Sequence, residues 1–366
     1  MALSIAALRE SAPGERRVAM VPEVAQKLCA GGFKVLLEKG AGEAAGYPDA
    51  AYEGVAWQDA DGIASSADLL WCVQMPPADR LARMRKGSVL VGHLDPRRHA
   101  DALGQLAAGG VTAFALELLP RTTRAQAMDI LSSQAAVAGY RAMLVAAVEC
   151  PRFFPMLTTA AGTIRPSKVL VIGAGVAGLQ AIATARRLGA QVEGYDVRSE
   201  TREQVQSLGA KFLDLGVSAA GEGGYARELT AEERQAQQQA LADHLATVDV
   251  VVTTAAVPGR PAPRILSEAM VEGMKPGALI VDMAAEGGGN CVLTRPGERI
   301  EHQGKTVIGP LNLASGAAFH ASQMYSRNLQ QFSALLVGEQ GLAPDFDDEL
   351  VAGTAVVRDG TVVFKA

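Results

Sequence analysis

One stretch of ten residues, Val169 to Gly178, constrains the fold more than any other part of the chain. It reads V-L-V-I-G-A-G-V-A-G, so an apolar run typical of a buried strand enters a G-x-G-x-x-G turn that opens a helical pattern. Strand, turn and helix in this order are typical of the first unit of a parallel sheet that binds a dinucleotide. Gly173 permits the tight turn, Gly175 lets the backbone approach a pyrophosphate, and Gly178 lets the helix pack against its strand.

The residues after this turn indicate which dinucleotide is bound. Val176 and Ala177 begin the helix, whose N-terminus offers N–H donors and a partial positive charge to phosphates. Asp196 ends the next strand-like run, where a carboxylate can accept hydrogen bonds from both ribose hydroxyls of an adenosine. Arg198 could hold a 2′-phosphate, but Asp196 would repel that phosphate. We therefore expect NAD(H) rather than NADP(H); the alternative is a glycine turn with a purely conformational role.

Length and composition narrow the classes of protein to which this chain can belong. A chain of 366 residues is long enough for two domains, each with its own core. A net charge of −5 without a basic run argues against nucleic acid as a partner. The four cysteines have no zinc-binding spacing, which favours a reduced, cytoplasmic chain. We expect no signal peptide, because the N-terminus lacks a basic region followed by a long apolar run. We expect no membrane span, because Tyr140 and Arg141 interrupt the longest apolar stretch, 135–148.

Alternation of β-branched runs with helical segments predicts an α/β fold of two domains. We expect the first, Rossmann-like domain to be discontinuous, over 1–128 and 311–366, because a helix near 317–337 returns the chain to it. The second, over 129–310, is expected to be a Rossmann doubly wound parallel sheet, with 129–149 as the interdomain helix. Strands are expected at 3–7, 34–38, 69–73, 88–91 and 112–115, and at 168–172, 191–195, 249–254, 278–283 and 305–309.

Two glycine-rich loops break the regular pattern. One covers 213–228 and is expected to be a mobile surface loop, and the other covers 286–290, directly after a predicted strand. Ligands of open α/β sheets bind outside the carboxyl ends of the strands, so both loops could reach a nucleotide. The alternative is that each loop is a plain connector.

Several motifs resemble one family. The segment Arg9 to Glu23 resembles the N-terminal signature shared by alanine dehydrogenases and pyridine nucleotide transhydrogenases. Residues 121–142 are similar to the transhydrogenase version of the interdomain helix. Further similar segments are 161–163, 178–185, 195–198, 223–226 and 287–291, so the resemblance spans nearly the whole chain. It is to the extramembranous NAD(H)-binding component of proton-translocating NAD(P)+ transhydrogenases, here expected as a separate alpha-type subunit.

This resemblance implies a function and partners. The chain would pass a hydride from NADH to NADP+ that is bound on a beta-type partner subunit, while a membrane-spanning subunit couples the transfer to proton movement. The family and the apolar character of 130–148 also predict a homodimer. The chain itself would be peripheral, on the cytoplasmic face of the inner membrane, and would be held there through its partners.

The resemblance also implies site residues. Arg121, Gln126, Asp129 and Ser132 match the motif around the nicotinamide end, where Gln126 would bridge toward the second nucleotide. The alternatives are an ordinary Arg121–Asp129 ion pair and a Ser132 side chain that bonds its own helix. Tyr225 would belong to a loop that closes over the nucleotide. The full predicted nucleotide site consists of Gly173, Gly175, Val176, Ala177, Gly178, Asp196, Val197, Arg198, Gly224, Tyr225, Ala255 and Ala256, with no metal.

Two other functions remain open. An alanine dehydrogenase needs an acid–base residue at the substrate amine, and in that family a lysine lies in the turn that matches Val73 to Pro77. This chain has Gln74 there, although a small shift of the alignment would bring His93 into play. Arg17 matches the residue that binds the substrate carboxylate, but without the lysine we expect it to have a structural or interface role. The third possibility is a non-enzymatic NAD-binding regulatory module.

Overall fold

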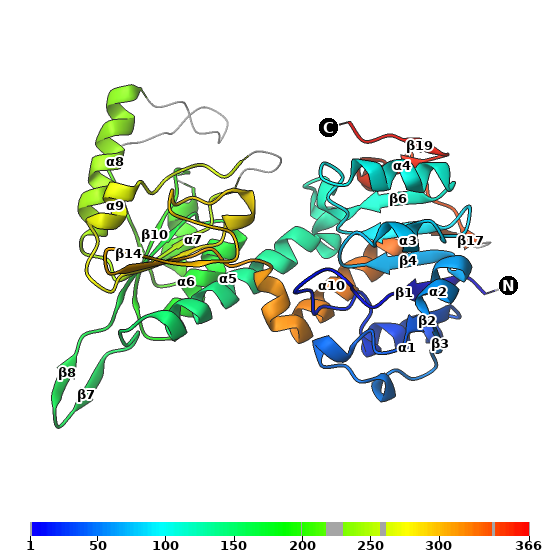
Figure 1. Cartoon of the computed structure of the whole chain (residues 1–366), viewed down its shortest axis with the longest axis horizontal. Helices are drawn as coiled ribbons and strands as arrows, with labels where there is room; N and C mark the ends of the chain where they lie inside the picture. The colour runs from blue at the N-terminus through cyan, green and yellow to red at the C-terminus, as the bar shows by residue number, and fades with distance from the viewer. Residues whose placement is uncertain (1, 199, 217–229, 257–260, 339–340, 366) are drawn as a thin grey trace. The chain divides into compact units, whose positions relative to one another are not determined.

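The structure is a computed structural model that describes the whole chain except residues 1, 199, 217–229, 257–260, 339–340 and 366 (Figure 1). It divides into two compact units, unit 1 over 1–134 with 314–366 and unit 2 over 135–313. Each unit contains a mainly parallel sheet with helices beside it (Figure 1). The predicted fold class, two α/β domains of which one is discontinuous in sequence, is confirmed.

Unit 1 is built on an eight-stranded sheet in the order β19-β18-β6-β5-β4-β1-β2-β3. Six of these strands are parallel and follow the 3-2-1-4-5-6 order of a doubly wound fold, and the last two are antiparallel additions. The strands are β1 (Ser4–Ala7), β2 (Lys34–Glu38), β3 (Ala56–Gln58), β4 (Leu69–Cys72), β5 (Val89–Gly92), β6 (Thr112–Ala115), β18 (Ala355–Arg358) and β19 (Thr361–Val362).

Both faces of this sheet are buried, as a parallel sheet requires. Within β1, Ile5 and Ala7 belong to one core cluster, whereas Ala6 belongs to the other, because successive side chains point to opposite faces. The helices of this unit are α1 (Pro22–Ala30), α2 (Ala60–Ser66), α3 (Ala78–Leu81), α4 (Ala100–Ala108), α10 (Ala318–Ser333) and α11 (Glu349–Thr354). The C-terminal segment that contains α11, β18 and β19 adds the last two strands to the sheet of unit 1, next to β6.

Unit 2 contains a seven-stranded sheet in the order β11-β10-β9-β12-β13-β15-β14. It is parallel except for β14, which pairs with β15 in a hairpin at one edge. The strands are β9 (Lys168–Ile172), β10 (Gln191–Tyr195), β11 (Lys211–Phe212), β12 (Val250–Thr253), β13 (Leu279–Asp282), β14 (Arg299–His302) and β15 (Lys305–Ile308). β9 lies inside the sheet between β10 and β12, so the glycine-rich turn that follows it is at the point where the strand order reverses.

The helices of unit 2 are α6 (Val176–Arg187), α7 (Thr201–Ser207), α8 (Ala231–Leu245) and α9 (Glu268–Glu272). Val169 and Val171 of β9 point into one core cluster, and Leu170 and Ile172 point into the other. Two further hairpins were not predicted: β16 (Val337–Gly338) with β17 (Gly341–Leu342) in unit 1, and β7 (Leu157–Thr159) with β8 (Gly162–Ile164) in unit 2. The β7–β8 hairpin extends away from the sheet of unit 2 (Figure 1).

Helix α5 (Ile130–Glu149) begins in the sequence of unit 1 and continues in that of unit 2. Among the described residues it is the one helix that is long and apolar enough to cross a membrane, although one or two such helices are weak evidence of a span. Ala142, Met143 and Ala146 belong to a core cluster of unit 2, and the core helix of a folded domain meets the same criterion.

Candidate functional site

The turn after β9 is closed by glycines that no other residue could replace without a shift of the backbone. Gly173 has φ +98°, and a Cβ on it would lie 2.4 Å from Oγ1 of Thr254. A Cβ on Gly178 would lie 1.7 Å from the carbonyl oxygen of Gly173. Gly173 and Gly178 are therefore needed for the turn itself, because even a methyl group would collide there.

Gly175 differs from the other two glycines. It has an ordinary φ of −79°, and among the described residues no atom beyond its chain neighbours lies within 4 Å of the Cβ that it lacks. As the N-cap of α6 it provides no side-chain hydrogen bond, and the amides of Val176 and Ala177, in the first turn, have no partner within the helix. On the other side of this turn, Gly139 of α5 allows contact with the backbone of Ala177, because a Cβ there would lie 2.1 Å from that carbonyl oxygen. An open helix N-terminus of this kind attracts phosphates.

Asp196 follows β10 and lies next to this turn. Its carboxylate accepts a hydrogen bond from the amide of Ala174 at 2.7 Å and one from the amide of Arg198 at 2.9 Å. The Arg198 guanidinium donates two more, from Nε and Nη2, both at 3.0 Å. Burial raises the pKa of Asp196, but the bonds from Arg198 and the backbone outweigh it and hold the pKa below its usual value. The carboxylate is thus ionised near neutral pH.

These four bonds have a consequence for ligand binding. A carboxylate has about four acceptor positions, and Ala174 and Arg198 engage Asp196 from four directions. Two of the donors belong to the Arg198 side chain, which is 45% exposed, whereas the carboxylate of Asp196 is 7% exposed. A ribose can therefore form hydrogen bonds with this carboxylate only if it displaces the Arg198 side chain. The sequence placed both residues in the site but did not indicate that they pair with each other.

The loop after β12 is held by a buried polar network. Asn290 accepts from the amide of Ala255 at 3.1 Å and donates to the carbonyl oxygens of Ala255 and Pro263, both at 2.8 Å. Asp282, at the end of β13, holds Asn290 in place, because its carboxylate accepts a hydrogen bond from the backbone N–H of Asn290 at 2.7 Å. Gly289 is required there, because a Cβ would lie 2.7 Å from Oδ2 of Asp282. The loop over 286–290 thus supports the backbone at Ala255, a function that the sequence did not indicate.

Other predicted nucleotide residues lie at the surface of unit 2 or outside the described part of the chain. Val176 is 45% exposed, Val197 is 50% exposed, and Ala256 is exposed as well. Gly224 and Tyr225, with most of the predicted loop over 213–228, lie outside the described residues.

The four residues predicted for the nicotinamide end belong to unit 1. Arg121 and Gln126 are exposed, Gln126 within a 3-10 helix, η4 (Thr123–Met128). Asp129 precedes α5 and accepts two bonds from Ser132, from its amide at 2.9 Å and its hydroxyl at 2.6 Å. Asp129 therefore acts as the N-cap of α5. No Arg121–Asp129 ion pair is present among the described residues, and the roles of all four side chains in catalysis stay predictions.

A buried ionic cluster in unit 1 contains Arg17 and Gln74, the two positions at which the sequence was compared with alanine dehydrogenases. Arg17 and Glu15 form a bidentate ion pair, in which Nε and Nη2 of Arg17 donate to Oε1 and Oε2 of Glu15 at 2.8 Å and 2.7 Å. Their side chains are 8% and 0% exposed. Arg17 also donates to Gln134 of α5 at 2.8 Å. Burial raises the pKa of Glu15, but Arg17 outweighs it and lowers the pKa to about 2. Gln74 donates to the same Glu15 carboxylate at 3.1 Å.

Glu10 and Glu117 are two further carboxyls of this unit that the sequence did not single out. Glu10 accepts from the amides of Val73 and Gln74, and burial raises its pKa to about 8. Glu117 accepts from the amide of Leu94 at 3.0 Å, and burial raises its pKa too. Both carboxyls bond the backbone after a strand, so each fixes a turn of unit 1.

Comparison with known proteins matches the whole of this architecture. Residues 6–138 match the family "Alanine dehydrogenase/PNT, N-terminal domain" and residues 142–365 match "Alanine dehydrogenase/PNT, C-terminal domain". An NAD(P) transhydrogenase alpha-subunit protein of Rhodospirillum rubrum is 44% identical over 100% of this chain and 98% of that protein.

Two further comparisons place the chain within this family. The alanine dehydrogenase of Mycolicibacterium smegmatis is 30% identical over 77% of this chain and 72% of that protein. The crystal structure of transhydrogenase from Sinorhizobium meliloti has a TM-score of 0.89 and 45% identity, and the match covers 98% of this chain and 100% of that chain. Fold, glycine turn and sequence agree, and the chain belongs to the alanine dehydrogenase/PNT family.

Proposed function

We propose that this chain is the NAD(H)-binding subunit of a proton-translocating NAD(P)+ transhydrogenase. The observation that carries the proposal is the uncapped N-terminus of α6, with no described atom near the missing Cβ of Gly175 and with the ionised Asp196 beside it. An open helix N-terminus suits a pyrophosphate, and a carboxylate at the end of the second strand suits a ribose diol. The relatives named NAD(P) transhydrogenase subunit alpha support the same assignment.

The residues present fit a dinucleotide. The amides of Val176 and Ala177 would hold the pyrophosphate, and Asp196 would hold the adenosine ribose after the Arg198 side chain gives way. The exposed side chain of Val197 is suited to an adenine ring. The proposed site also includes Ala255 and Ala256 at the end of β12, as well as Gly224 and Tyr225, which lie outside the described residues.

Bound NADH would supply a hydride to NADP+ on the partner subunit. This transfer moves no proton, so the chain needs groups that position and exclude water rather than a general acid or base. The amide of Gln126 and the guanidinium of Arg121 are exposed and suited to bond a carboxamide. Asp129 and Ser132 bond each other at the start of α5 and would fix the segment that carries both groups.

Gln74 favours transhydrogenase over alanine dehydrogenase. It replaces the lysine that a dehydrogenase would require, it cannot transfer a proton near neutral pH, and its amide already donates to Glu15. Arg17 has its guanidinium engaged by Glu15 and Gln134, which suits a structural role rather than the binding of a substrate carboxylate.

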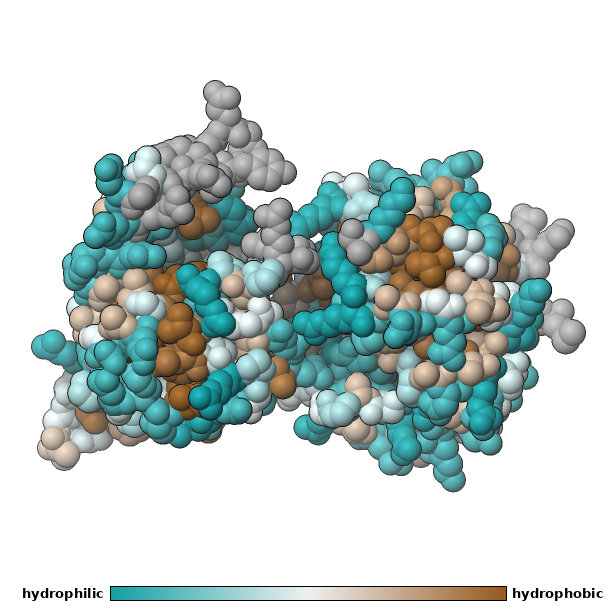
Figure 2. All heavy atoms as spheres, turned by 45° about the horizontal axis from the view of Figure 1, so that its top comes forward, coloured by the Kyte–Doolittle hydropathy of each residue, from teal (hydrophilic) through white to brown (hydrophobic). Residues whose placement is uncertain are grey.

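The proposed assembly has three kinds of partner. An NADP(H)-binding beta subunit would receive the hydride, a membrane-spanning subunit would couple it to protons, and a second copy of this chain would form a homodimer. The chain would thus be peripheral on the cytoplasmic face of the inner membrane. Apolar side chains on and near the β7–β8 hairpin support the homodimer; they are Phe153 (53% exposed), Met156 (64%), Leu157 (38%) and Ile164 (48%). Apolar patches also interrupt the mostly hydrophilic face in Figure 2.

The decisive experiment mixes this chain with a separately purified NADP(H)-binding transhydrogenase domain. We expect rapid hydride transfer between NADPH on that domain and the acetylpyridine analogue of NAD+ on this chain, followed by stopped-flow absorbance. A parallel assay with L-alanine and with pyruvate plus ammonium should give no turnover. Alanine turnover without transfer would assign the chain to the dehydrogenases and make His93 the residue to test. NADH binding with neither activity would favour a regulatory module.

The homodimer has its own test. Size-exclusion chromatography with light scattering should give twice the mass of the chain at micromolar concentration. A monomeric mass under these conditions would contradict the dimer but not the NAD(H) site.

A further inference from the structure

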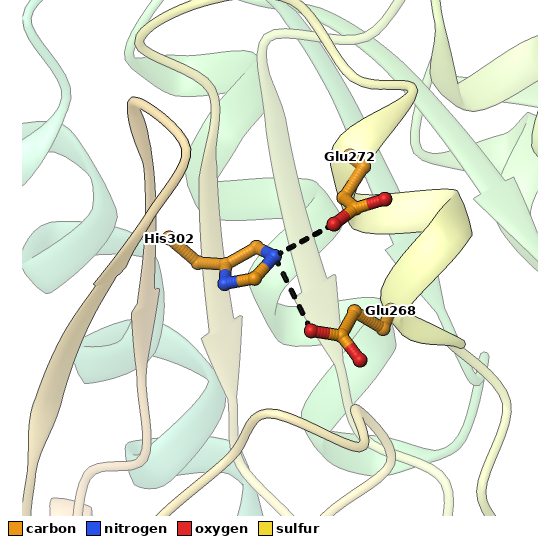
Figure 3. Close-up of side chains that lie close together, drawn as sticks. All are labelled: Glu268, Glu272 and His302. Atoms are coloured by element: carbon orange, nitrogen blue, oxygen red, sulfur yellow. Dashed lines mark hydrogen bonds and ion pairs between the residues drawn. The ribbon is translucent and has the colours of Figure 1, made fainter.

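Three side chains with metal-binding groups converge in unit 2, between α9 and the edge strand β14 (Figure 3). Glu268 and Glu272 lie one turn apart on α9, and His302 is the last residue of β14. Nε2 of His302 lies 3.1 Å from Oε1 of Glu272 and 3.5 Å from Oε1 of Glu268. The ligand atoms of all three lie within 4.8 Å of one another.

These separations suit a bound cation. Zinc binds nitrogen and carboxylate oxygen at about 2.0–2.2 Å in a tetrahedral arrangement, so two of its ligand atoms are about 3.3–3.5 Å apart. Both distances from His302 are close to this separation. A neutral imidazole with two carboxylates also brings two negative charges to a divalent ion. The same distances fit a protonated histidine between two glutamates, so the experiment has to separate these two states.

The backbone around the three residues is fixed by the fold. Ser267 caps α9, because its hydroxyl accepts from the amide of Met270 at 3.3 Å. His302 pairs with Lys305 across a two-residue hairpin in which Gln303 has φ +45° and Gly304 has φ +72°. Two consecutive positive φ angles are those of the tight turn that favours hairpins, so the position of His302 is well defined.

Two neighbours of Glu272 act as supporting groups. Nε2 of Gln303 donates to Oε1 of Glu272 at 2.5 Å, and Nζ of Lys305 donates to the backbone carbonyl oxygen of Glu272 at 2.8 Å. The bond from Gln303 therefore orients the carboxylate, as hydrogen bonds usually orient the ligands of metal sites. The Lys305 ammonium bonds the backbone of Glu272 and leaves the carboxylate to His302 and Gln303.

We propose that Glu268, Glu272 and His302 bind a divalent transition-metal cation of the zinc type. The three protein groups would hold the ion and a water molecule would complete the tetrahedron. Because α9 and the edge strand β14 are separate in the sequence, the ion would join them and stabilise this edge of unit 2. The site lies on the surface, with side chains 58%, 38% and 23% exposed for Glu268, Glu272 and His302, so the ion would reach it directly from solvent.

The test is isothermal titration calorimetry of the whole, untagged chain with zinc chloride, repeated for His302→Gln and Glu272→Gln. Loss of a supporting group alone changes metal affinity by about 10–100-fold, so loss of a ligand should weaken zinc binding at least tenfold. The matched control is His320→Gln, which removes an exposed histidine of α10 in unit 1 and should leave the affinity unchanged. Cobalt(II) should give the strong visible absorption of a tetrahedral site in the parent chain and lose it in His302→Gln.

A second readout is thermal stability. Zinc should raise the melting temperature of the parent chain and of His320→Gln but not that of His302→Gln. Zinc binding that is unchanged in His302→Gln would overturn the proposal, because the ion would then lie elsewhere. Absence of zinc binding at micromolar to submillimolar concentration would also overturn it and leave a histidine–glutamate ion pair as the full account of the cluster.

Discussion

Replacement of Arg198 by alanine should tighten NADH binding, contrary to the usual effect of removing a positive charge from a nucleotide site. In the structure the Arg198 side chain takes two acceptor positions of Asp196 with bonds of 3.0 Å each. A ribose that bonds this carboxylate has to displace them. The substitution removes that competition, while the amides of Ala174 and of residue 198 itself keep the carboxylate in place.

The size of the effect follows from the exposure of the pair. Because Arg198 is 45% exposed, its ion pair belongs to the partly screened class, which is worth about 0.2–1 kcal/mol. Removing this competition should lower the Kd for NADH by about 1.4- to 5-fold. Asp196→Asn should act in the opposite direction, because bonds to a charged acceptor are worth about 1.5–3 kcal/mol, or about 10- to 150-fold in Kd. NADPH should gain nothing from Arg198→Ala, since the change removes a cation that could hold a 2′-phosphate.

The assay is a titration of NADH fluorescence at fixed ionic strength, with Arg299→Ala as the matched control. Arg299 is also half exposed and paired, with Glu149 and Glu301, but it lies on the edge strand β14, which four other strands separate from β10. Its loss should leave the Kd unchanged. If Arg198→Ala weakened NADH binding while Arg299→Ala did not, Arg198 would be a direct contact of the nucleotide, and our reasoning about competition for Asp196 would be wrong.

Three further predictions concern other regions of the chain. Gly175→Ala should weaken NADH binding with little loss of stability, because its Cβ would contact no atom of the described residues beyond its chain neighbours. Gly178→Ala should also lower the melting temperature, because its Cβ would lie 1.7 Å from a carbonyl oxygen. Gln126→Asn should slow hydride transfer by about 100-fold with little change in the Kd for NADH, if it shifts the rings by about 1 Å; stopped-flow kinetics and fluorescence titration separate the two quantities. Glu15→Gln should cost about 3–5 kcal/mol in the free energy of unfolding, measured by urea titration, because it leaves Arg17 as a buried charge without its carboxylate.

Each of these predictions has a control or a contradicting result. For Glu15→Gln the control is Asp61→Asn, which breaks an exposed pair with Arg83 and should cost at most about 1 kcal/mol. Equal costs for the buried and the exposed pair would refute the buried-pair argument. If Gly175→Ala and Gly178→Ala lost stability to the same extent, the space in front of α6 would not be open. If NADH affinity and transfer rate fell in equal proportion in Gln126→Asn, this residue would be only a binding residue.

The strands and the glycine turn of unit 2 could be predicted because their signals are local. The run over 169–172 is continuous and apolar, its side chains are buried on both faces of the sheet, and the turn requires glycines that the sequence displays. Helix α8 was missed although its signal was present: Thr230 and Glu233 form a capping box, with both reciprocal bonds made. The short strand β3 and the helix α9 gave too few residues for a periodic pattern.

For the candidate site, the sequence predicted which residues belong to it but not the hydrogen bonds between them. Residue types and spacing indicated Asp196 and Arg198, but not that the Arg198 side chain takes two acceptor positions of this carboxylate. Likewise, the sequence indicated a glycine-rich loop over 286–290 without its function, which is to position Asn290 against Ala255. Hydrogen bonds of this kind depend on side-chain orientation, and a one-dimensional pattern carries no information about orientation.

The sequence by itself thus determined which segments become strands, turns and helices around Val169 to Gly178, because the steric needs of a glycine and the burial of an apolar run act within a few neighbouring residues. Only the tertiary structure decided which groups meet: Arg17 with Gln134 in unit 1, and Glu272 with His302 in unit 2. These partners are far apart along the chain. Their contact depends on how sheets and helices pack, and that packing is set by all the core residues together.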